Sequence, residues 1–535
     1  MMTSSESSTP SSYQNSKAYI VGGGIAALAT AVYLIKEGGL SGKGVYIFEQ
    51  DAVPGGCLDG AGSSDEGYLI RGGRMFEEHF VCTWDLFSKI PSLRDPDKTI
   101  KDDFIEFNKT FTSESHCRLL RNGKKLDVSS YGLSNKDSID MLKLLFSSEE
   151  SLGDKRIIDC FSTSFFETNY WYLWQTTFAF QKWSSAAEMR RYSIRFIHLL
   201  PGFNQLKGIL RTEYNQYDSV VRPTVKWLRE QGVNFVLNSQ VIDVDFDMQA
   251  DSKTATALYY LKDNQETRID LTLHDYLFIS NGSMVDAATV GSMTSVPELK
   301  GKQDAASWLL WQKLARKSPA FGNPAVFCDH VDLSKWQSFT VTLKNPRFFN
   351  FMQQFTGNTA GTGGLLTFTD SSWLMSVVLA QQPHFIDQPD DVWVFWGYGL
   401  YPDNEGDYVN KKMSDCTGAE IITELCHHLK ISDKQHDYFD TANCIPCIMP
   451  YIDSQFMPRK PGDRPQIVAE GSTNFAFIGQ FSEQPNDCVF TVEYSVRSAQ
   501  TAVYSLLNLE KQACPIYEGH HDIRVLINSL NATRR

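Results

Sequence analysis

The 535-residue sequence lacks the features that assign a chain to several common classes of protein. It contains no run of about 18 apolar residues, so no segment is predicted to span a membrane. No G-x-S-x-G motif occurs, which leaves a hydrolase triad without its usual nucleophile turn. Lys and Arg number 50 against 63 Asp and Glu, and the resulting net charge of -13 argues against a nucleic acid as the main partner.

Cysteines are missing where redox or metal chemistry would need them. Cys57 stands alone, whereas a disulfide reductase needs a second cysteine a few residues away. The pair Cys444 and Cys447 has no second pair at metal spacing, although residues 426–428 supply a cysteine and two histidines, so we predict no metal site. The 11 cysteines follow no regular framework, which favours reduced thiols and a cytoplasmic location. Residues 1–16 are rich in Ser without an apolar signal segment and are predicted to form a disordered tail.

One βαβ unit with a dinucleotide fingerprint organises the rest of the sequence. The apolar run 18–21 predicts a buried strand that leads into residues 22–27, Gly-Gly-Gly-Ile-Ala-Ala, a G-x-G-x-x-A motif. Apolar residues then recur at helical spacing as far as Ile35, and a second strand, 45–48, ends on Glu49. A merely structural glycine turn is the alternative, but the flanking elements favour an adenine dinucleotide.

Each position of the fingerprint has a physical role. Gly22 permits a tight turn, Gly24 leaves room for a pyrophosphate beside the backbone, and Ala27 lets helix and strand pack closely. The helix N-terminus offers unpaired N–H groups to the phosphates. Glu49 can accept hydrogen bonds from both ribose hydroxyls and disfavours a 2'-phosphate.

Two later features favour FAD over NAD. The apolar run 475–478 predicts a late strand that ends on Gly479, and apolar residues at helical spacing over 492–506 predict a helix after it. Two-lobed flavin folds bring a strand and helix of this kind toward the flavin ring. The glycines at 361–364 lack the spacing and the preceding strand of a nicotinamide fingerprint. We therefore predict an α/β, Rossmann-like, two-lobed FAD-binding fold of the glutathione-reductase or amine-oxidase type, with a substrate lobe and a short helical C-terminal segment.

The aromatic content of 13% and the aromatic cluster at 170–183 are typical of an apolar pocket wall, although a buried helix explains the cluster equally well. The predicted parts of the chain are a tail at 1–16, an FAD lobe at 17–136, 211–290 and 460–507, a substrate lobe at 137–210 and 291–459, and a C-terminal tail at 508–535.

Longer stretches of the sequence resemble one known family. Residues 71–93, which begin Arg-Gly-Gly-Arg, and residues 174–180, 214–217, 382–385 and 490–497 are similar to the fatty acid hydratase family, the oleate hydratases once called myosin-cross-reactive antigens. The resemblance implies an FAD-binding hydro-lyase. Such an enzyme adds water across a cis double bond of a free unsaturated fatty acid, such as oleate or linoleate, without net redox change. This agrees with the missing reductase motifs.

The resemblance also implies catalytic residues. Tyr192 falls at the position of the proton donor, and residues 71–75 would lie between flavin and substrate. Better-known members carry a Glu after Arg-Gly-Gly-Arg that activates water, whereas this chain carries Met75, whose sulfur takes no proton at neutral pH. Glu77 or Glu78 could supply the carboxylate if the loop folds differently, or the reduced flavin could orient the water.

Further residues are predicted to bind the ligands. Gln216 and His384 match residues associated with the fatty acid carboxylate, but a polar Thr and Asn pair before the His is replaced by Val378 and Ala380. The residues predicted to bind FAD are Gly22, Gly24, Ala26, Ala27, Glu49, Gly56, Arg71, Gly73, Arg74, Asn281, Gly479 and Glu493.

Two alternative functions remain open on the sequence. One is a redox flavoenzyme of the amine oxidase or desaturase type, and the other is a lipid-binding flavoprotein that lost catalysis with the Glu. The C-terminal segment ends on Arg534 and Arg535, and in the family this end can touch membranes or partner subunits. We expect peripheral membrane contact at most, and a monomer or a homodimer.

Overall fold

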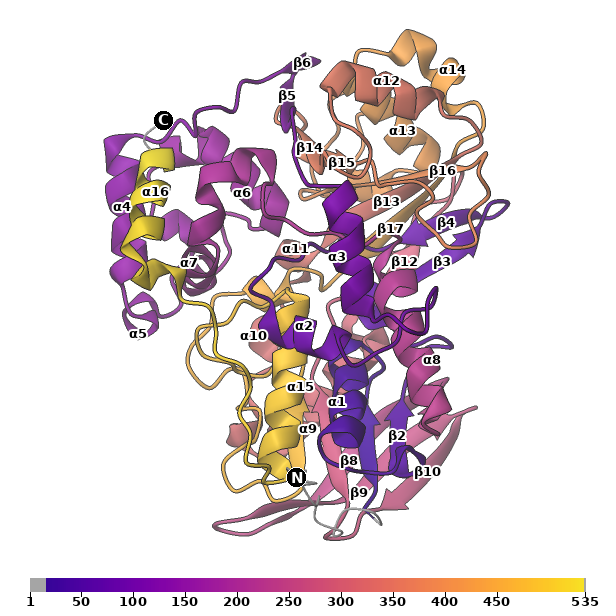
Figure 1. Cartoon of the computed structure of the whole chain (residues 1–535), viewed down its shortest axis with the longest axis vertical. Helices are drawn as coiled ribbons and strands as arrows, with labels where there is room; N and C mark the ends of the chain where they lie inside the picture. Colours follow the sequence, from indigo (N-terminus) through magenta and orange to yellow (C-terminus); the bar gives the residue numbers. More distant parts are fainter. Residues whose placement is uncertain (1–15, 534–535) are drawn as a thin grey trace, which may run out of the picture.

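The computed structural model describes residues 16–533 (Figure 1), so residues 1–15 of the tail predicted at 1–16 and the last two arginines lie outside the described residues. The fingerprint forms the predicted βαβ unit, with β1 at Ala18–Val21, α1 at Ile25–Lys36 and β2 at Val45–Phe48. Residues Ile25–Leu34 of α1 are all buried, because small alanine side chains let this helix approach its neighbours closely on every side.

A five-stranded parallel sheet forms around this unit. Its strand order is β18-β11-β1-β2-β7, with β7 at Asn234–Val236, β11 at Tyr276–Ser280 and β18 at Phe475–Ile478. The late strand and its following helix, α15 at Val492–Leu506, lie where the sequence predicts them, and α15 packs beside α1 (Figure 1). The antiparallel strands β8 (Ser239–Met248), β9 (Lys253–Lys262) and β10 (Gln265–Asp270) make a separate small sheet.

The second large sheet is mixed and has the order β12-β17-β13-β16-β15-β14-β5-β6. Its strands are β12 (Thr289–Val290), β17 (Asn443–Met449), β13 (Trp336–Leu343), β16 (Trp393–Gly399), β15 (Met375–Val378), β14 (Leu365–Phe368), β5 (Leu119–Arg121) and β6 (Lys124–Lys125). β5 pairs with β14, so residues 119–125 extend this sheet, although the sequence predicts them in the FAD lobe. Strand runs this short carry no signal for the sheet that they join.

Helices cover both sheets. Around the parallel sheet lie α2 (Val81–Phe87), α8 (Arg222–Glu230) and α9 (Ala306–Lys317), and α3 (Ile100–Thr110) packs on α2 at the level of the mixed sheet. Short helices α10 (Ala325–Cys328) and α11 (Val331–Ser334) lead into β13, and α12 (Arg347–Thr356), α13 (Gly418–His428) and α14 (Gln435–Phe439) cover the outer face of the mixed sheet.

A third group of helices stands to one side of both sheets (Figure 1). It consists of α4 (Asn135–Phe146), α5 (Glu149–Leu152), α6 (Asn169–Phe178), α7 (Ala186–Arg195) and the C-terminal α16 (Ile523–Thr533). The aromatic cluster of the sequence forms α6, and Tyr170, Trp171 and Trp174 are buried in its core. None of the described helices combines the length and the apolar character that crossing a bilayer requires.

A hairpin of two strands connects the parallel and mixed sheets. β3 (Gly60–Ser63) and β4 (Gly67–Ile70) pair with each other, and the backbone of β4 lies against β13. The N–H groups of Tyr68 and Ile70 donate to the hydroxyls of Thr342 and Thr340 at 2.8 and 3.1 Å. Residues 71–75 follow this hairpin directly and therefore emerge at the junction of the two sheets.

Candidate functional site

The first cavity is a cleft at the carboxyl ends of β1, β2, β11 and β18, the edge at which parallel α/β sheets bind nucleotides. Eight of the residues predicted to bind the cofactor line it: Gly22, Gly24, Ala26, Glu49, Gly56, Arg71, Asn281 and Gly479.

Two features of the cleft fit a dinucleotide. A side chain added at Gly24 would meet nothing within 4 Å, so the backbone there faces open space at the start of α1. Asn281 is only 2% exposed, yet neither polar atom of its amide has a hydrogen-bond partner among the described residues. A buried amide without a partner is costly, and a polar ligand would satisfy it. The residues present therefore fit FAD.

Glu49 is held at the end of β2 by backbone groups. Its Oε2 accepts from the N–H of Gly23 at 2.7 Å and its Oε1 from the N–H of Asp51 at 3.0 Å. Burial raises the pKa of this carboxyl. A side chain at Gly23 would come within 2.7 Å of Oε2, so the middle glycine, to which the sequence analysis gave no role, makes room for Glu49.

The loop at residues 71–75 separates this cleft from a second cavity. Arg71 lines the nucleotide cleft and pairs with Asp59 at 3.1 Å, whereas Gly73, Arg74 and Met75 line the second cavity. The Arg74 guanidinium donates to the carbonyl of Gly73 at 3.1 Å.

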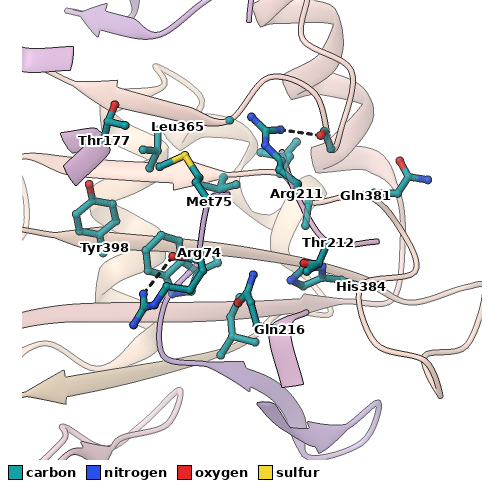
Figure 2. Close-up of a pocket in the computed structure, with 18 of the residues that line it drawn as sticks. Arg74, Met75, Thr177, Arg211, Thr212, Gln216, Leu365, Gln381, His384 and Tyr398 are labelled. Carbon is teal, nitrogen blue, oxygen red and sulfur yellow. Dashed lines mark hydrogen bonds between the residues drawn. The ribbon is translucent and has the colours of Figure 1, made fainter. Parts of the chain in front are cut away.

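The second cavity, which we call the substrate cavity, is mainly apolar (Figure 2). Its apolar walls are Ile70, Met75, Phe107, Ala179, Trp336, Leu365, Val378, Leu379, Ala380, Trp396 and Phe490. Arg74 and Arg211 bring two positive charges to it, and none of the described residues that line it is an Asp or a Glu. The substrate cavity is therefore suited to an apolar molecule with an anionic group.

The polar groups of the substrate cavity differ in protonation and in hydrogen bonding. Gln216 and His384, the residues predicted for the carboxylate, both line it. Burial lowers the pKa of His384 to about 4, so this imidazole is neutral at pH 7. The hydroxyl oxygen of Thr177 accepts from Arg118 at 2.8 Å, which leaves its hydrogen free to donate. Thr177 and Arg211 line the same cavity but were not predicted from the sequence. Thr177 lies within residues 174–180 and Arg211 lies just before residues 214–217, and both segments resemble the family. This resemblance was the feature of the sequence that could have pointed to the two residues.

Met75 enters the substrate cavity, but Tyr192 does not line it. Figure 2 shows the Met75 side chain directed toward Leu365. Tyr192 is 1% exposed and donates to the carbonyl of Val489 at 2.5 Å. Val489 directly precedes Phe490, which lines the cavity. The Tyr192 hydroxyl therefore bonds to a residue adjacent to the cavity wall. Burial raises the pKa of Tyr192 well above its usual value.

Glu77 and Glu78 also lie away from the substrate cavity. Glu77 is buried and contacts Arg195 at 3.3 Å, His79 at 2.9 Å and His198 at 3.4 Å. Burial acts to raise its pKa, but hydrogen bonds from the two histidines and the charge of Arg195 together lower it to about 2. The Glu78 side chain is 77% exposed.

Two residues predicted to bind FAD lie outside both cavities. Ala27 is fully buried where α1 packs on its neighbours. Glu493 accepts from the N–H groups of Cys82 and Thr83 at 3.0 and 2.8 Å and pairs with Arg497 at 2.6 Å. Its carboxylate thus caps the N-terminus of α2 and joins α2 to α15.

Substituting Gly24 with valine should abolish flavin binding while leaving the fold intact. Gly24 has a φ of -74°, which any residue adopts, and its side-chain position opens into the nucleotide cleft. If FAD occupies the nucleotide cleft, we expect the purified variant to lack the visible flavin absorbance of the wild type and to melt at the temperature of wild-type protein stripped of flavin. A variant that retains stoichiometric flavin would show that the cofactor does not pass over this glycine.

Comparisons with known proteins agree with this arrangement. Residues 15–504 match the MCRA family. The chain is 40% identical over 531 residues to the oleate hydratase of Streptococcus pyogenes serotype M49 (strain NZ131), covering 97% of this chain and 90% of that protein. It is 35% identical over 535 residues to the linoleate hydratase of Lactiplantibacillus plantarum, covering 91% and 93% of the two chains.

The fold has relatives among solved structures. The crystal structure of an oxidoreductase from Methanosarcina mazei matches with a TM-score of 0.50 at 12% identity, covering 92% of this chain and 100% of that one. At this identity the likeness concerns the fold alone. The sequence matches extend over nearly the whole chain and include the motifs from which the resemblance was inferred. The chain therefore belongs to the MCRA family, the myosin-cross-reactive antigens.

Proposed function

We propose that the protein binds FAD in the nucleotide cleft and adds water across a cis double bond of a free unsaturated fatty acid, such as oleate or linoleate, without net redox change. The observation that carries this proposal is the substrate cavity. It is apolar, bears two arginines, has no Asp or Glu among the described residues that line it, and meets the nucleotide cleft at residues 71–75. The names of the two hydratase relatives support the same reaction.

The same observations support a two-lobed FAD fold of the glutathione-reductase or amine-oxidase type. Gly22, Gly24 and Glu49 would hold the adenine half, and Asn281 and Gly479 lie at the neighbouring strand ends. The bound flavin would supply a polar ring face beside residues 71–75 without transferring electrons.

The protein's own residues would bind and orient the fatty acid. The apolar walls take up the acyl chain and exclude bulk water, while Gln216 and the neutral His384 offer hydrogen bonds to its polar end. Protonating an isolated alkene develops positive charge, so the reaction needs a proton donor and a water molecule on opposite faces of the double bond. We assign the proton donor to Tyr192 on the family match, a role that requires its hydroxyl to exchange the carbonyl of Val489 for the double bond of a bound substrate.

Activation of water is the step that Met75 alters. A carboxyl with a pKa of about 2, such as Glu77, is a poor proton acceptor at neutral pH. In the structure Glu77 is engaged with Arg195 and two histidines, and Glu78 faces solvent. Either carboxylate could act as the base only if the loop rearranged, whereas Thr177 already presents a hydroxyl in the substrate cavity.

Incubating the FAD-loaded protein with oleate or linoleate in H₂¹⁸O should yield a hydroxy fatty acid that carries one solvent oxygen, detected by mass spectrometry. The assay is run with oxidised and with reduced flavin. Absence of this product in both flavin states would contradict hydration. Oxygen consumption or flavin reduction by substrate would instead identify a redox flavoenzyme, and tight fatty acid binding without turnover would identify a lipid-binding flavoprotein.

Replacing Tyr192 with phenylalanine should lower kcat by at least about 100-fold, the usual contribution of a positioned acid. Binding of palmitate, which has no double bond, should not change. Tyr170→Phe is the matched control, since Tyr170 is equally buried and its hydroxyl has no hydrogen-bond partner among the described residues. Near-normal turnover by Tyr192→Phe would show that the Tyr192 hydroxyl has no part in the reaction.

We also propose a cytoplasmic location with peripheral membrane contact through the helical group. All 11 cysteines, each within the described part of the chain, are free thiols. On α16, Ile523 and Ile527 are 65% and 51% exposed at a spacing of one helical turn. Phe146 on α4, in the same helical group, is 83% exposed. An exposed apolar stripe of this kind suits insertion at a lipid surface.

Replacing Ile527 with glutamate should reduce cosedimentation with vesicles that contain anionic lipid, because it puts a negative charge in the apolar stripe. Leu273→Glu is the control, since Leu273 is 81% exposed and follows shortly after β10, which lies at the opposite end of the molecule from α16 (Figure 1). Unchanged vesicle binding by Ile527→Glu together with dissociation of a dimer in gel filtration would show that the stripe serves self-association instead.

A further inference from the structure

Two carboxylates and one imidazole meet where the second half of α13 packs against the loop at residues 404–411. One carboxylate oxygen of Asp407, one of Glu424 and a ring nitrogen of His428 lie within 4.8 Å of one another. The Nε2 atom of His428 is 3.3 Å from Oδ2 of Asp407 and 3.3 Å from Oε1 of Glu424. None of the three residues lines the nucleotide cleft or the substrate cavity, so this cluster is separate from the site described above.

The negative charges of the cluster have little compensation from the protein. The Glu424 side chain is fully buried, and the Asp407 side chain is 32% exposed. Among the described residues, no Lys or Arg lies within ion-pair distance of either carboxylate. Two carboxylates this close repel each other, and a buried charge without a cation beside it is costly. A cation between them would remove this cost.

His428 does not satisfy both carboxylates by hydrogen bonding. It is 2% exposed, and neither of its ring nitrogens has a hydrogen-bond partner among the described residues. Nε2 carries at most one hydrogen, which can serve only one of the two oxygens well. A metal ion has no such restriction. Ligand atoms at about 2.1 Å from a tetrahedral Zn²⁺ lie about 3.4 Å apart, close to the two distances of 3.3 Å found here.

Hydrogen bonds from the surrounding chain hold both carboxylates in place. Oε1 of Glu424 accepts from the N–H of Asp407 at 2.7 Å. Oε2 of Glu424 accepts from the N–H groups of Tyr408 and Val409 at 3.0 and 2.9 Å. Ser372 donates to the Asp407 carboxylate through its N–H at 2.8 Å and through its hydroxyl at 2.7 Å. Outer hydrogen bonds of this kind orient carboxylates that bind metals.

A second group of side chains offers the same kinds of ligand atom: Glu77, His79 and His198. Arg195 lies 3.3 Å from the carboxylate of that group and already supplies a positive charge, so a metal ion is not needed there. The cysteine pair of β17 is also unsuited to a metal, because Cys444 and Cys447 pack into different core clusters. The sequence analysis predicted no metal site, because only the fold of the loop brings Asp407 to His428.

We propose that Asp407, Glu424 and His428 bind one first-row divalent cation, best matched by Zn²⁺, with solvent completing its coordination on the exposed side of Asp407. An imidazole beside carboxylates suits Zn²⁺, whereas Mg²⁺ and Ca²⁺ prefer ligand sets made of oxygen alone. The ion fastens the loop at 404–411 to α13, on the outer face of the mixed sheet and remote from the nucleotide-binding unit (Figure 1). It is a structural ion, and its binding does not depend on the proposed reaction.

The test uses the full-length, FAD-loaded protein after treatment with a chelator. Equilibrium dialysis against ZnCl₂, read by atomic emission, should give one bound Zn²⁺ per chain, and MgCl₂ in excess should not displace it. Zn²⁺ should also raise the melting temperature, because an ion that binds only the folded state stabilises that state.

Three variants locate the ion. His428→Gln should weaken Zn²⁺ binding at least about 100-fold and remove the rise in melting temperature, because it deletes a ligand. Ser372→Ala keeps all three ligands and loses one outer hydrogen bond, so binding should weaken by about 10-fold. His427→Gln is the matched control, since this adjacent histidine of α13 is half-buried and stacks on Tyr408 instead. It should bind Zn²⁺ as the wild type does.

Two results would overturn the proposal. A wild type that binds no Zn²⁺ and melts at the same temperature with and without it would do so without any variant, even if His428→Gln fails to fold. Binding that survives in His428→Gln but is lost in His198→Gln would place the ion beside Glu77 instead. Because binding and melting are measured without substrate, neither result bears on hydration, and a failure of the proposed reaction would leave the metal site standing.

Discussion

The position of both cavities depends on the backbone hydrogen bonds between β4 and the threonines of β13. β4 belongs to a hairpin that leaves the nucleotide-binding unit, and two of its N–H groups end on the hydroxyls of Thr340 and Thr342. Those hydroxyls are fully buried, so without the hairpin they would be left unsatisfied in the core. The interaction fixes Ile70, and the five residues that follow it then form the partition between the nucleotide cleft and the substrate cavity.

The two cavities on either side of residues 71–75 also differ in how their charged residues are paired. In the nucleotide cleft, acidic Glu49 is satisfied by the backbone and Arg71 is paired with Asp59. The substrate cavity has no such compensation, because the residue after Arg74 is a methionine. A carboxylate at position 75 would place a negative charge in the same cavity as Arg74 and Arg211. Without it both cations are open to an incoming anion, and in the proposed reaction proton transfer would fall to hydroxyl groups or to a rearranged loop.

Local patterns in the sequence were enough to predict the nucleotide-binding unit. The fingerprint, the strand ending on Glu49 and the late strand at 475–478 each depend on residues close together in the chain. The placement of Tyr192 could not be predicted in this way. Its surroundings come from Phe178, Phe456 and Val489, and only packing decides that its hydroxyl meets a backbone carbonyl. The position of Arg211 in the substrate cavity could not be predicted either, since a sequence does not show which distant residues line the same cavity.

The parallel sheet also has a consequence for biosynthesis. Its strand order places β18, which begins at Phe475, against β11, so the nucleotide cleft gains its last wall only when almost the whole chain has left the ribosome. Until then, one edge of β11 is unpaired, and such edges are prone to pair with other chains. Capture of the proposed flavin would accordingly follow translation, and cells that made this protein faster than they supplied the cofactor would accumulate a complete chain with an open cleft.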